Sequence, residues 1–290
     1  MNCDENHAPF VHVRQYAKTV AFAATLMASP VAALAAQQTI DPVADSLVGL
    51  WTDSVGGMRT FEALRTAEFT VTTFLYDTTT TRLKRARPRY VWLAKGSFGE
   101  ATRVERWEGD DFIVQGFNGR DPAWAVMNGE WLNDSAKDAS EALYVARDLF
   151  YWIGLPFKLR DPGVHLSYLG LRERPGSPWS GERDFEHRAP DGRYHAVAVS
   201  FGAGVGEHQD VFTYYFAPGS GFPLEVTYVE EGRENINRLL WGPTARSGDL
   251  AFPHVTRRDF ITASGKRTKA LVIENVTVNA AVLPERFERP

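Results

Sequence analysis

Cysteine is nearly absent from this sequence. Its 290 residues contain one cysteine, Cys3, which precedes an apolar segment with the features of an export signal. Once that segment is removed, we expect a mature chain without cysteine. Such a chain excludes disulfides, thiolate metal sites and a cysteine nucleophile. Its stability therefore has to come from a packed core, and the chain is long enough to build one.

Long apolar runs are lacking beyond the first 36 residues. The run at 20–35 is shorter than the roughly 20 residues that a membrane-spanning helix needs. Arg14 and Lys18 precede it, and residues 33–35 (ALA) form a small-x-small cleavage site. We therefore predict a signal peptide over residues 1–36 that is cleaved near Ala35. Residues 37–290 are then expected to form one soluble periplasmic domain without a transmembrane span.

Strong net charge and recognisable catalytic motifs are lacking as well. The formal net charge of −4 gives no reason to expect nucleic acid as a partner. Gly202–Gly206 is followed by a predicted strand and lacks the Lys-Ser or Lys-Thr pair of a phosphate loop. No serine stands in a G-x-S-x-G setting. The histidines of the mature chain match no metal-ligand spacing, and they are His165, His187, His195, His208 and His254. We predict no catalytic residue, metal or cofactor.

Apolar and aromatic residues are plentiful, at 44% and 12% of the chain. Residues 41–55 show helical spacing of apolar side chains, with Val43, Leu47, Leu50, Trp51 and Val55 on one face. A short helix around 58–64 and a third helix at 138–153 are also predicted. The other segments have strand composition, with tight turns at the Asn-Gly pairs 118–119 and 128–129. Because no helical crossovers separate the strands, the fold class is mainly β, with an antiparallel sheet.

A basic run occupies residues 82–89, with the sequence RLKRARPR. It could meet an acidic partner or anionic lipid. The alternative is a solvated loop that guards the edge of a sheet, with Pro88 blunting that edge.

Three segments carry a resemblance to a known superfamily. They are residues 56–71, with the Gly56-Gly57 break, residues 146–170, with LPFKL at 155–159, and residues 273–287, which end in LPERF. In these the chain resembles the LolA/LolB-like superfamily of periplasmic lipoprotein carriers and receptors, and particularly the other periplasmic families built on that fold. The resemblance implies a curved antiparallel half-barrel sheet with helices on its concave face, where carriers hold acyl chains.

The resemblance would bring a set of aromatic side chains together around such a cavity. An ordinary filled core is the alternative. The candidate cavity residues are Trp51, Phe61, Phe74, Trp92, Trp124, Phe150, Trp152 and Phe157.

These observations favour a periplasmic binding or carrier protein for an apolar, lipid-like ligand. The helices predicted at 41–55 and 138–153 would act as its movable lid. One alternative is an enzyme that acts on a small apolar substrate in the same cavity, with His195 or His208 paired with Asp210. Another is a cell-envelope interaction module, with a second envelope protein as its partner.

Overall fold

The structure is a computed structural model. It divides the chain into residues 1–35 and residues 36–290. It describes residues 40–96, 99–120, 122–132, 153–175, 192–202, 205, 210–229, 236–242 and 244–289. The predicted signal peptide therefore lies outside the described residues, as does nearly all of the predicted helix at 138–153.

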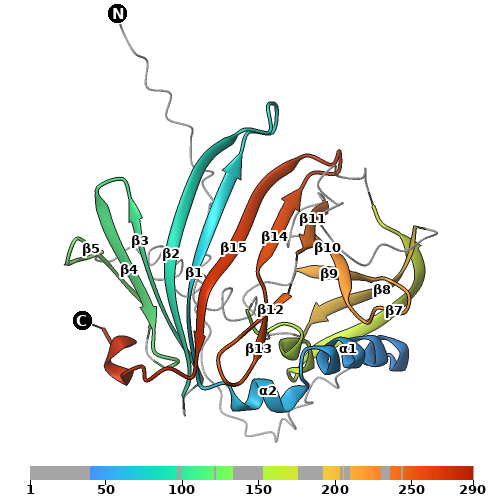
Figure 1. Cartoon of the computed structure of the whole chain (residues 1–290), viewed down its shortest axis with the longest axis horizontal. Helices are drawn as coiled ribbons and strands as arrows, with labels where there is room; N and C mark the ends of the chain where they lie inside the picture. The colour runs from blue at the N-terminus through green and yellow to red at the C-terminus, as the bar shows by residue number, and fades with distance from the viewer. Residues whose placement is uncertain are drawn as a thin grey trace, which may run out of the picture. The chain divides into compact units, whose positions relative to one another are not determined.

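One antiparallel sheet of 13 strands dominates the described residues (Figure 1). Its order is β6-β5-β4-β3-β2-β1-β15-β14-β11-β10-β9-β8-β7, so the first and last strands of the chain pair near the middle of the sheet. The strands are β1 (Thr66–Tyr76), β2 (Leu83–Gly96), β3 (Gly99–Glu108), β4 (Asp111–Phe117), β5 (Trp124–Met127), β6 (Glu130–Trp131), β7 (Val164–Glu173), β8 (Arg193–Phe201), β9 (Val211–Phe216), β10 (Pro223–Val229), β11 (Ile236–Trp241), β14 (Arg257–Ile261) and β15 (Arg267–Val278). A separate hairpin joins β12 (Thr244–Ser247) to β13 (Phe252–Val255).

The predicted mainly β, antiparallel class is confirmed. The turn residues explain much of the strand order, because short turns make consecutive strands neighbours. At the predicted turn between β5 and β6, Asn128 and Gly129 have φ of 53° and 86°. The Asn128 side chain also accepts a hydrogen bond from the amide of Phe112 at 2.8 Å. Within the described part of the chain the sheet is open, with β6 and β7 at its edges.

Helix α1 (Pro42–Ser54) confirms the first predicted helix. Asp41 caps it by accepting hydrogen bonds from the amides of Val43 and Ala44 at 2.8 and 3.1 Å. The predicted apolar face was wrong in part, because Val43 and Leu50 are about half exposed. The helix instead buries Ala44, Val48, Trp51 and Thr52, a stripe in which the small side chain of Ala44 allows close approach to the sheet.

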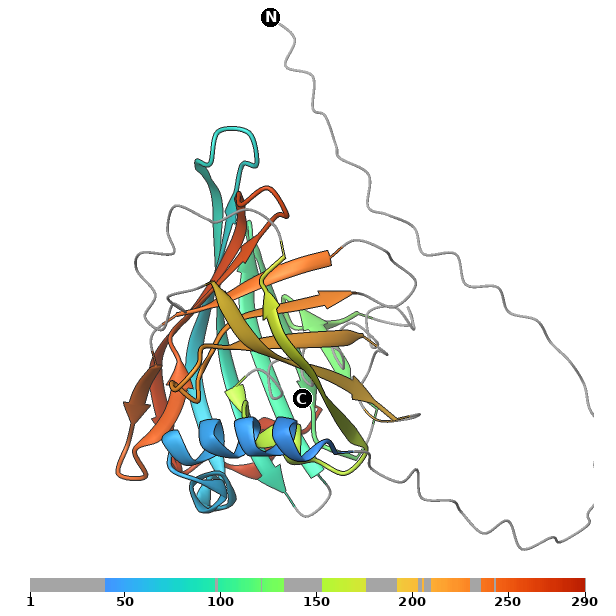
Figure 2. The same ribbon diagram turned by 90° about the vertical axis from the view of Figure 1, so that its right-hand side faces the viewer.

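Helix α2 (Met58–Ala63) follows after Gly56 and Gly57, whose positive φ of 103° and 76° suits glycine. Both helices lie at one end of the sheet, away from the hairpin that joins β1 and β2 (Figures 1 and 2). A one-turn helix, η1 (Phe157–Arg160), leads into β7.

The main apolar core lies on the face of the sheet that packs against α1, α2 and the segment 153–159. We call this the helix face. It carries side chains such as Phe69 of β1, Val91 of β2, Val199 of β8 and Leu239 of β11. We call the opposite face the tail face, because the C-terminal segment packs on its β1–β5 part. Glu68 of β1 and Trp92 of β2 belong to it.

Candidate functional site

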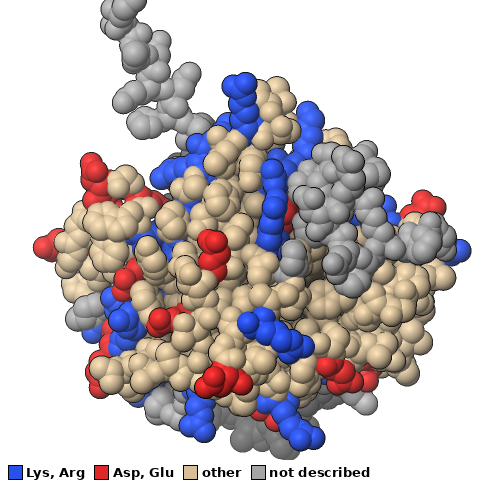
Figure 3. All heavy atoms as spheres, in the orientation of Figure 1, with Lys and Arg blue, Asp and Glu red and all other residues tan. Residues whose placement is uncertain are grey.

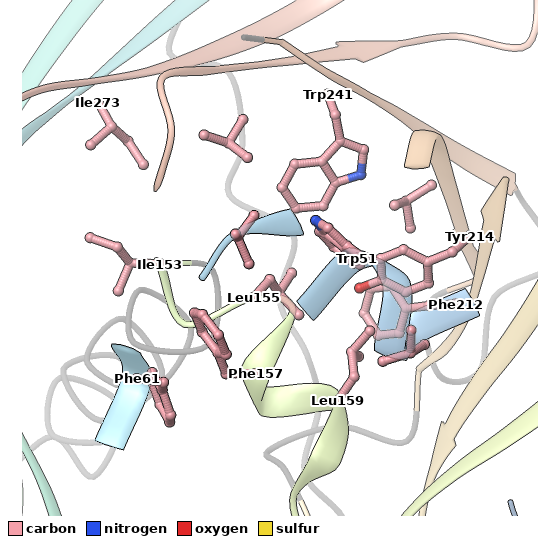
Figure 4. Close-up of a cluster of buried hydrophobic side chains, with 14 of the residues drawn as sticks. Trp51, Phe61, Ile153, Leu155, Phe157, Leu159, Phe212, Tyr214, Trp241 and Ile273 are labelled. Carbon is pink, nitrogen blue, oxygen red and sulfur yellow. The ribbon is translucent and has the colours of Figure 1, made fainter. Parts of the chain in front are cut away.

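Three of the predicted cavity residues, Trp51, Phe61 and Phe157, are buried in the core on the helix face (Figure 4). The Trp51 ring lies 5.7 to 6.0 Å from four other rings, and these belong to Tyr214, Phe216, Phe222 and Trp241. Phe61 and Phe157 are stacked with centroids 5.0 Å apart. These three residues therefore belong to the buried apolar cluster on the helix face.

The other described candidates lie elsewhere. Phe74 and Trp92 are on the tail face, where Trp92 Nε1 donates to Glu68 Oε2 at 3.1 Å. Trp124 belongs to a separate small cluster with Val114 and Val126. The last two candidates, Phe150 and Trp152, lie outside the described residues.

Residues 153–161 belong to the second segment that carries the resemblance. Their apolar side chains lie in the core, and their basic side chains form ion pairs with β3 and α1. Ile153, Leu155, Phe157 and Leu159 are buried, as are Gly154 and Pro156 between them, whereas Lys158 and Arg160 are partly exposed. The Lys158 ammonium bonds Glu100 of β3 at 2.7 Å and Asp161 at 2.5 Å. Burial opposes its charge, but these two carboxylates prevail and raise the pKa of Lys158. Arg160 bonds Asp45 of α1 at 2.5 Å, so the segment ties α1 to β3.

The C-terminal segment 280–289 packs on the tail face. Phe287 is 4% exposed, and its carbonyl accepts a hydrogen bond from Trp124 Nε1 at 3.2 Å. The Arg286 guanidinium lies 4.4 Å from the ring centroid of Trp92, and its carbonyl accepts from Arg103 at 3.0 Å. The residues of the LPERF motif thus include a buried anchor that sequence reasoning had not assigned to any partner.

A cavity of about 830 Å³ opens where β1, β10, β11, β14 and β15 reach their ends near the β14–β15 turn. Its wall includes helix-face side chains, of which Leu75, Tyr228 and Phe260 are apolar or aromatic. The complete lining is Leu75, Tyr228, Ile236, Asn237, Arg238, Phe260, Ile261, Thr262, Ala263, Thr268 and Lys269. None of the six described aromatic candidates is among these residues.

This cavity is remote from the helices. Leu75 lies nine residues beyond Thr66, where β1 leaves α2, and a strand of that length spans roughly 30 Å. Sequence reasoning missed the site because its walls come from the ends of five strands. The strand-like alternation of each segment was the only signal available.

Charged groups at the cavity have defined places. The Lys269 ammonium lies 3.7 Å from the ring centroid of Phe260. The Arg238 guanidinium bonds both carboxylate oxygens of Glu225, at 2.7 and 3.2 Å. Glu225 is fully buried and also bonds Arg174 at 2.8 Å. The charge of Arg238 is therefore balanced by a neighbouring carboxylate.

The basic run at 82–89 falls on β2 and its turn. Residues 83–88 pair with β1 alone, because the pairing of β2 with β3 begins at Arg89. Pro88 therefore stands where that part of β2 has an open side, as the edge-guard interpretation expects. Lys84 bonds Asp77 at 3.0 Å. Lys and Arg side chains gather at this end of the molecule (Figure 3).

The histidines form no metal site among the described residues, where no group of three metal-binding side chains occurs. His195 Nδ1 bonds the Tyr168 hydroxyl at 2.8 Å. Burial lowers the pKa of His254. His187 and His208 lie outside the described residues. Neither His195 nor Asp210 lines the cavity, so the polar pair of the enzyme hypothesis is not found there.

No protein-family model and no curated protein matches the sequence. Solved structures resemble it at low identity. A DUF1329 family protein from Desulfovibrio piger is 10% identical, with a TM-score of 0.48 over 84% of this chain and 97% of its own. A putative outer membrane lipoprotein-sorting protein domain from Vibrio parahaemolyticus is 8% identical, with a TM-score of 0.49 over 84% and 97%. A LolA superfamily protein from Nitrosomonas europaea is 10% identical, with a TM-score of 0.45 over 85% and 97%.

The resemblance seen in the sequence recurs in the structural comparison, because a LolA superfamily protein is among the solved structures to which this chain is similar. At these identities the likeness concerns the fold alone, and the ligand has to be argued from this chain's own residues. Among the described helices, none is long and apolar enough to cross a membrane.

Proposed function

We propose that this protein is a periplasmic carrier that binds an apolar, lipid-like molecule in the cavity at the strand ends. The observation that carries the proposal is the cavity itself. Its volume of about 830 Å³ lies within the range of roughly 300–1,000 Å³ that is usual for small-molecule sites. Leu75, Tyr228, Ile236 and Phe260 supply the apolar surface, and each ligand CH₂ buried there would contribute about 0.8 kcal/mol.

The helix face is the concave face in this proposal. β3 and β7 are nine positions apart in the strand order, which is roughly 43 Å in a flat sheet. Lys158 bonds Glu100 of β3, yet only six residues separate it from Val164, where β7 begins. Six residues span at most about 22 Å. The ion pair between Lys158 and Glu100 covers only part of the distance that would remain in a flat sheet. The chain length therefore supports a sheet that curves toward the helices.

The test is binding of an uncharged reporter, Nile red, to protein purified from the periplasm after expression of the full chain. Ile236→Glu places a charge in the apolar wall. Because Ile236 is 49% exposed, a ligand would bury about half of its side chain, which contributes about 1.4 kcal/mol to binding. Loss of this contribution should weaken binding roughly tenfold. Val211→Glu is the matched control, because Val211 is 48% exposed and Ile236 is 49% exposed, and both begin a strand.

Native mass spectrometry of the same preparation would identify any apolar molecule that remains bound. Retained lipid together with a selective loss in Ile236→Glu supports the proposal. A wild-type protein that carries no apolar molecule and binds no Nile red would refute it.

A further inference from the structure

We propose that the β1–β2 hairpin carries a binding site for a phosphate group, formed on the helix face by Arg85, Arg87 and Thr73. The site goes beyond the carrier function, because none of these three residues lines the apolar cavity. It gives a role to the basic run at 82–89. Two sources share the chemistry of the ligand, and they are a free phosphate and the phosphorylated headgroup of a larger molecule.

The register of the sheet places the three side chains together. Val91 of β2 is buried in the core on the helix face, so alternation along the strand puts Arg87 and Arg85 on that face as well. Thr73 of β1 pairs directly with Arg87. Directly paired residues have Cβ atoms about 5 Å apart, and residues two positions apart on a strand are separated by roughly 6.6 Å. A group the size of a phosphate can therefore contact all three side chains.

Two polar atoms of this site are buried without a hydrogen-bond partner. Thr73 is 6% exposed, and neither its Oγ1 nor the Nε of Arg87 has a partner among the described residues. Such atoms are uncommon in native proteins, because burying a polar group without a hydrogen bond costs free energy. The two atoms belong to a directly paired couple of residues, and both can donate a hydrogen. One oxyanion can therefore satisfy both of them.

The charge of the two arginines favours an anion with two negative charges. Within the part of the chain that the structure describes, neither Arg85 nor Arg87 forms an ion pair. On the same face of β3, the carboxylate of Glu108 bonds Arg106 at 3.1 Å instead. A phosphate monoester carries nearly two negative charges at pH 7, whereas a carboxylate carries one. The planar guanidinium group also matches the spacing of phosphate oxygens.

The test is isothermal titration calorimetry of the protein, purified from the periplasm, with inorganic phosphate, octyl phosphate and octanoate. We expect both phosphates to bind, and octyl phosphate to bind at least tenfold more tightly than octanoate, which has the same kind of chain and one charge less. Similar affinities for the two phosphates would identify a free phosphate as the ligand. An octyl phosphate affinity more than tenfold higher would identify a phosphorylated headgroup.

Substitution of the arginines locates the site. Arg87→Gln and Arg85→Gln should each weaken phosphate binding at least tenfold, because each variant loses a charge-assisted hydrogen bond. Arg82→Gln is the matched control, because Arg82 is an exposed arginine of the same hairpin that precedes β2. This variant loses the same charge, and its phosphate affinity should stay within about twofold of the wild type, because salt screens an exposed charge at that distance.

Thr73→Val separates binding from stability, because it removes the hydroxyl and keeps nearly the same side-chain shape. Without phosphate, the variant should unfold at the same temperature as the wild type or a higher one, since the hydroxyl has no partner. Its phosphate affinity should fall about fivefold through loss of one neutral hydrogen bond. Absence of binding of both phosphates at about 10 mM, or equal effects of Arg87→Gln and Arg82→Gln, would overturn the inference.

Discussion

The C-terminal anchor offers the sharpest test of the packing on the tail face. Phe287 is 4% exposed although only three residues follow it in the sequence, whereas Leu283, four residues earlier, is 72% exposed. We predict that Phe287→Ala lowers the free energy of unfolding by about 3 kcal/mol, and that Leu283→Ala changes it by less than about 0.5 kcal/mol.

The magnitude follows from what surrounds the ring. Replacing a buried phenylalanine by alanine usually costs about 3–5 kcal/mol, from lost burial and the cavity left behind. A terminal segment can shift to fill part of that cavity, which favours the lower end of the range. The hydrogen bond from Trp124 Nε1 to the Phe287 carbonyl and the contact of Arg286 with Trp92 depend on the same anchor. Both would weaken if the segment detached.

Urea unfolding followed by tryptophan fluorescence measures the change. With an m-value near 3 kcal/mol/M, the midpoint should fall by about 1 M for Phe287→Ala and stay in place for Leu283→Ala. Nile red affinity should remain within about twofold of the wild type, because none of the residues that contact the anchor lines the cavity. Equal stabilities for the two variants would refute the packing argument, and a large loss of Nile red binding would refute the separation of the anchor from the cavity.

Two further predictions concern buried charge. Glu225→Ala should lower the free energy of unfolding by about 3–5 kcal/mol, because it removes the carboxylate that pairs with the buried guanidinium of Arg238. As a control in the same urea titration, Glu108→Ala at a partly exposed ion pair should lower it by at most about 1 kcal/mol. Burial and, to a smaller degree, Arg258 lower the pKa of His254. Between the pKa of His254 in the folded protein and its higher pKa in the unfolded chain, His254 is therefore more protonated in the unfolded chain. The free energy of unfolding should then rise between about pH 5 and 7 by at most about 1.4 kcal/mol per pH unit from this group, and His254→Gln should flatten that rise.

Local signals in the sequence were sufficient for the class of the fold. The Asn-Gly pair at 128–129 forms the predicted turn, and the Thr- and aromatic-rich segment after Glu68 forms β1. These features depend on neighbouring residues alone. The apolar face of α1 was less predictable, because two overlapping stripes both satisfy helical spacing. Packing chose the one that contains Ala44 and Val48.

The placement of the aromatic residues required tertiary information. Trp92 stands between Val91 and Leu93, each 1% exposed, so alternation puts its side chain on the other face. Alternation does not say which face holds the main core, because this sheet buries apolar residues on both. The contact of Trp124 with Phe287 spans 163 positions of sequence, and no local pattern encodes it. The cavity is equally non-local, since it joins the ends of strands that are far apart in the chain.

The location of the cavity also bears on how a ligand would gain access. Helix α1 is poorly suited to act as the moving lid that the family resemblance implies. Ala44 and Val48 are fully buried, Trp51 is surrounded by four aromatic rings, and Asp45 is bonded to Arg160. Lifting α1 would expose all of this surface, and the tryptophan alone is worth about 3–5 kcal/mol. The cavity at the far end of β1 needs no such motion, so in the function proposed here a ligand would reach Phe260 while the helices stay packed.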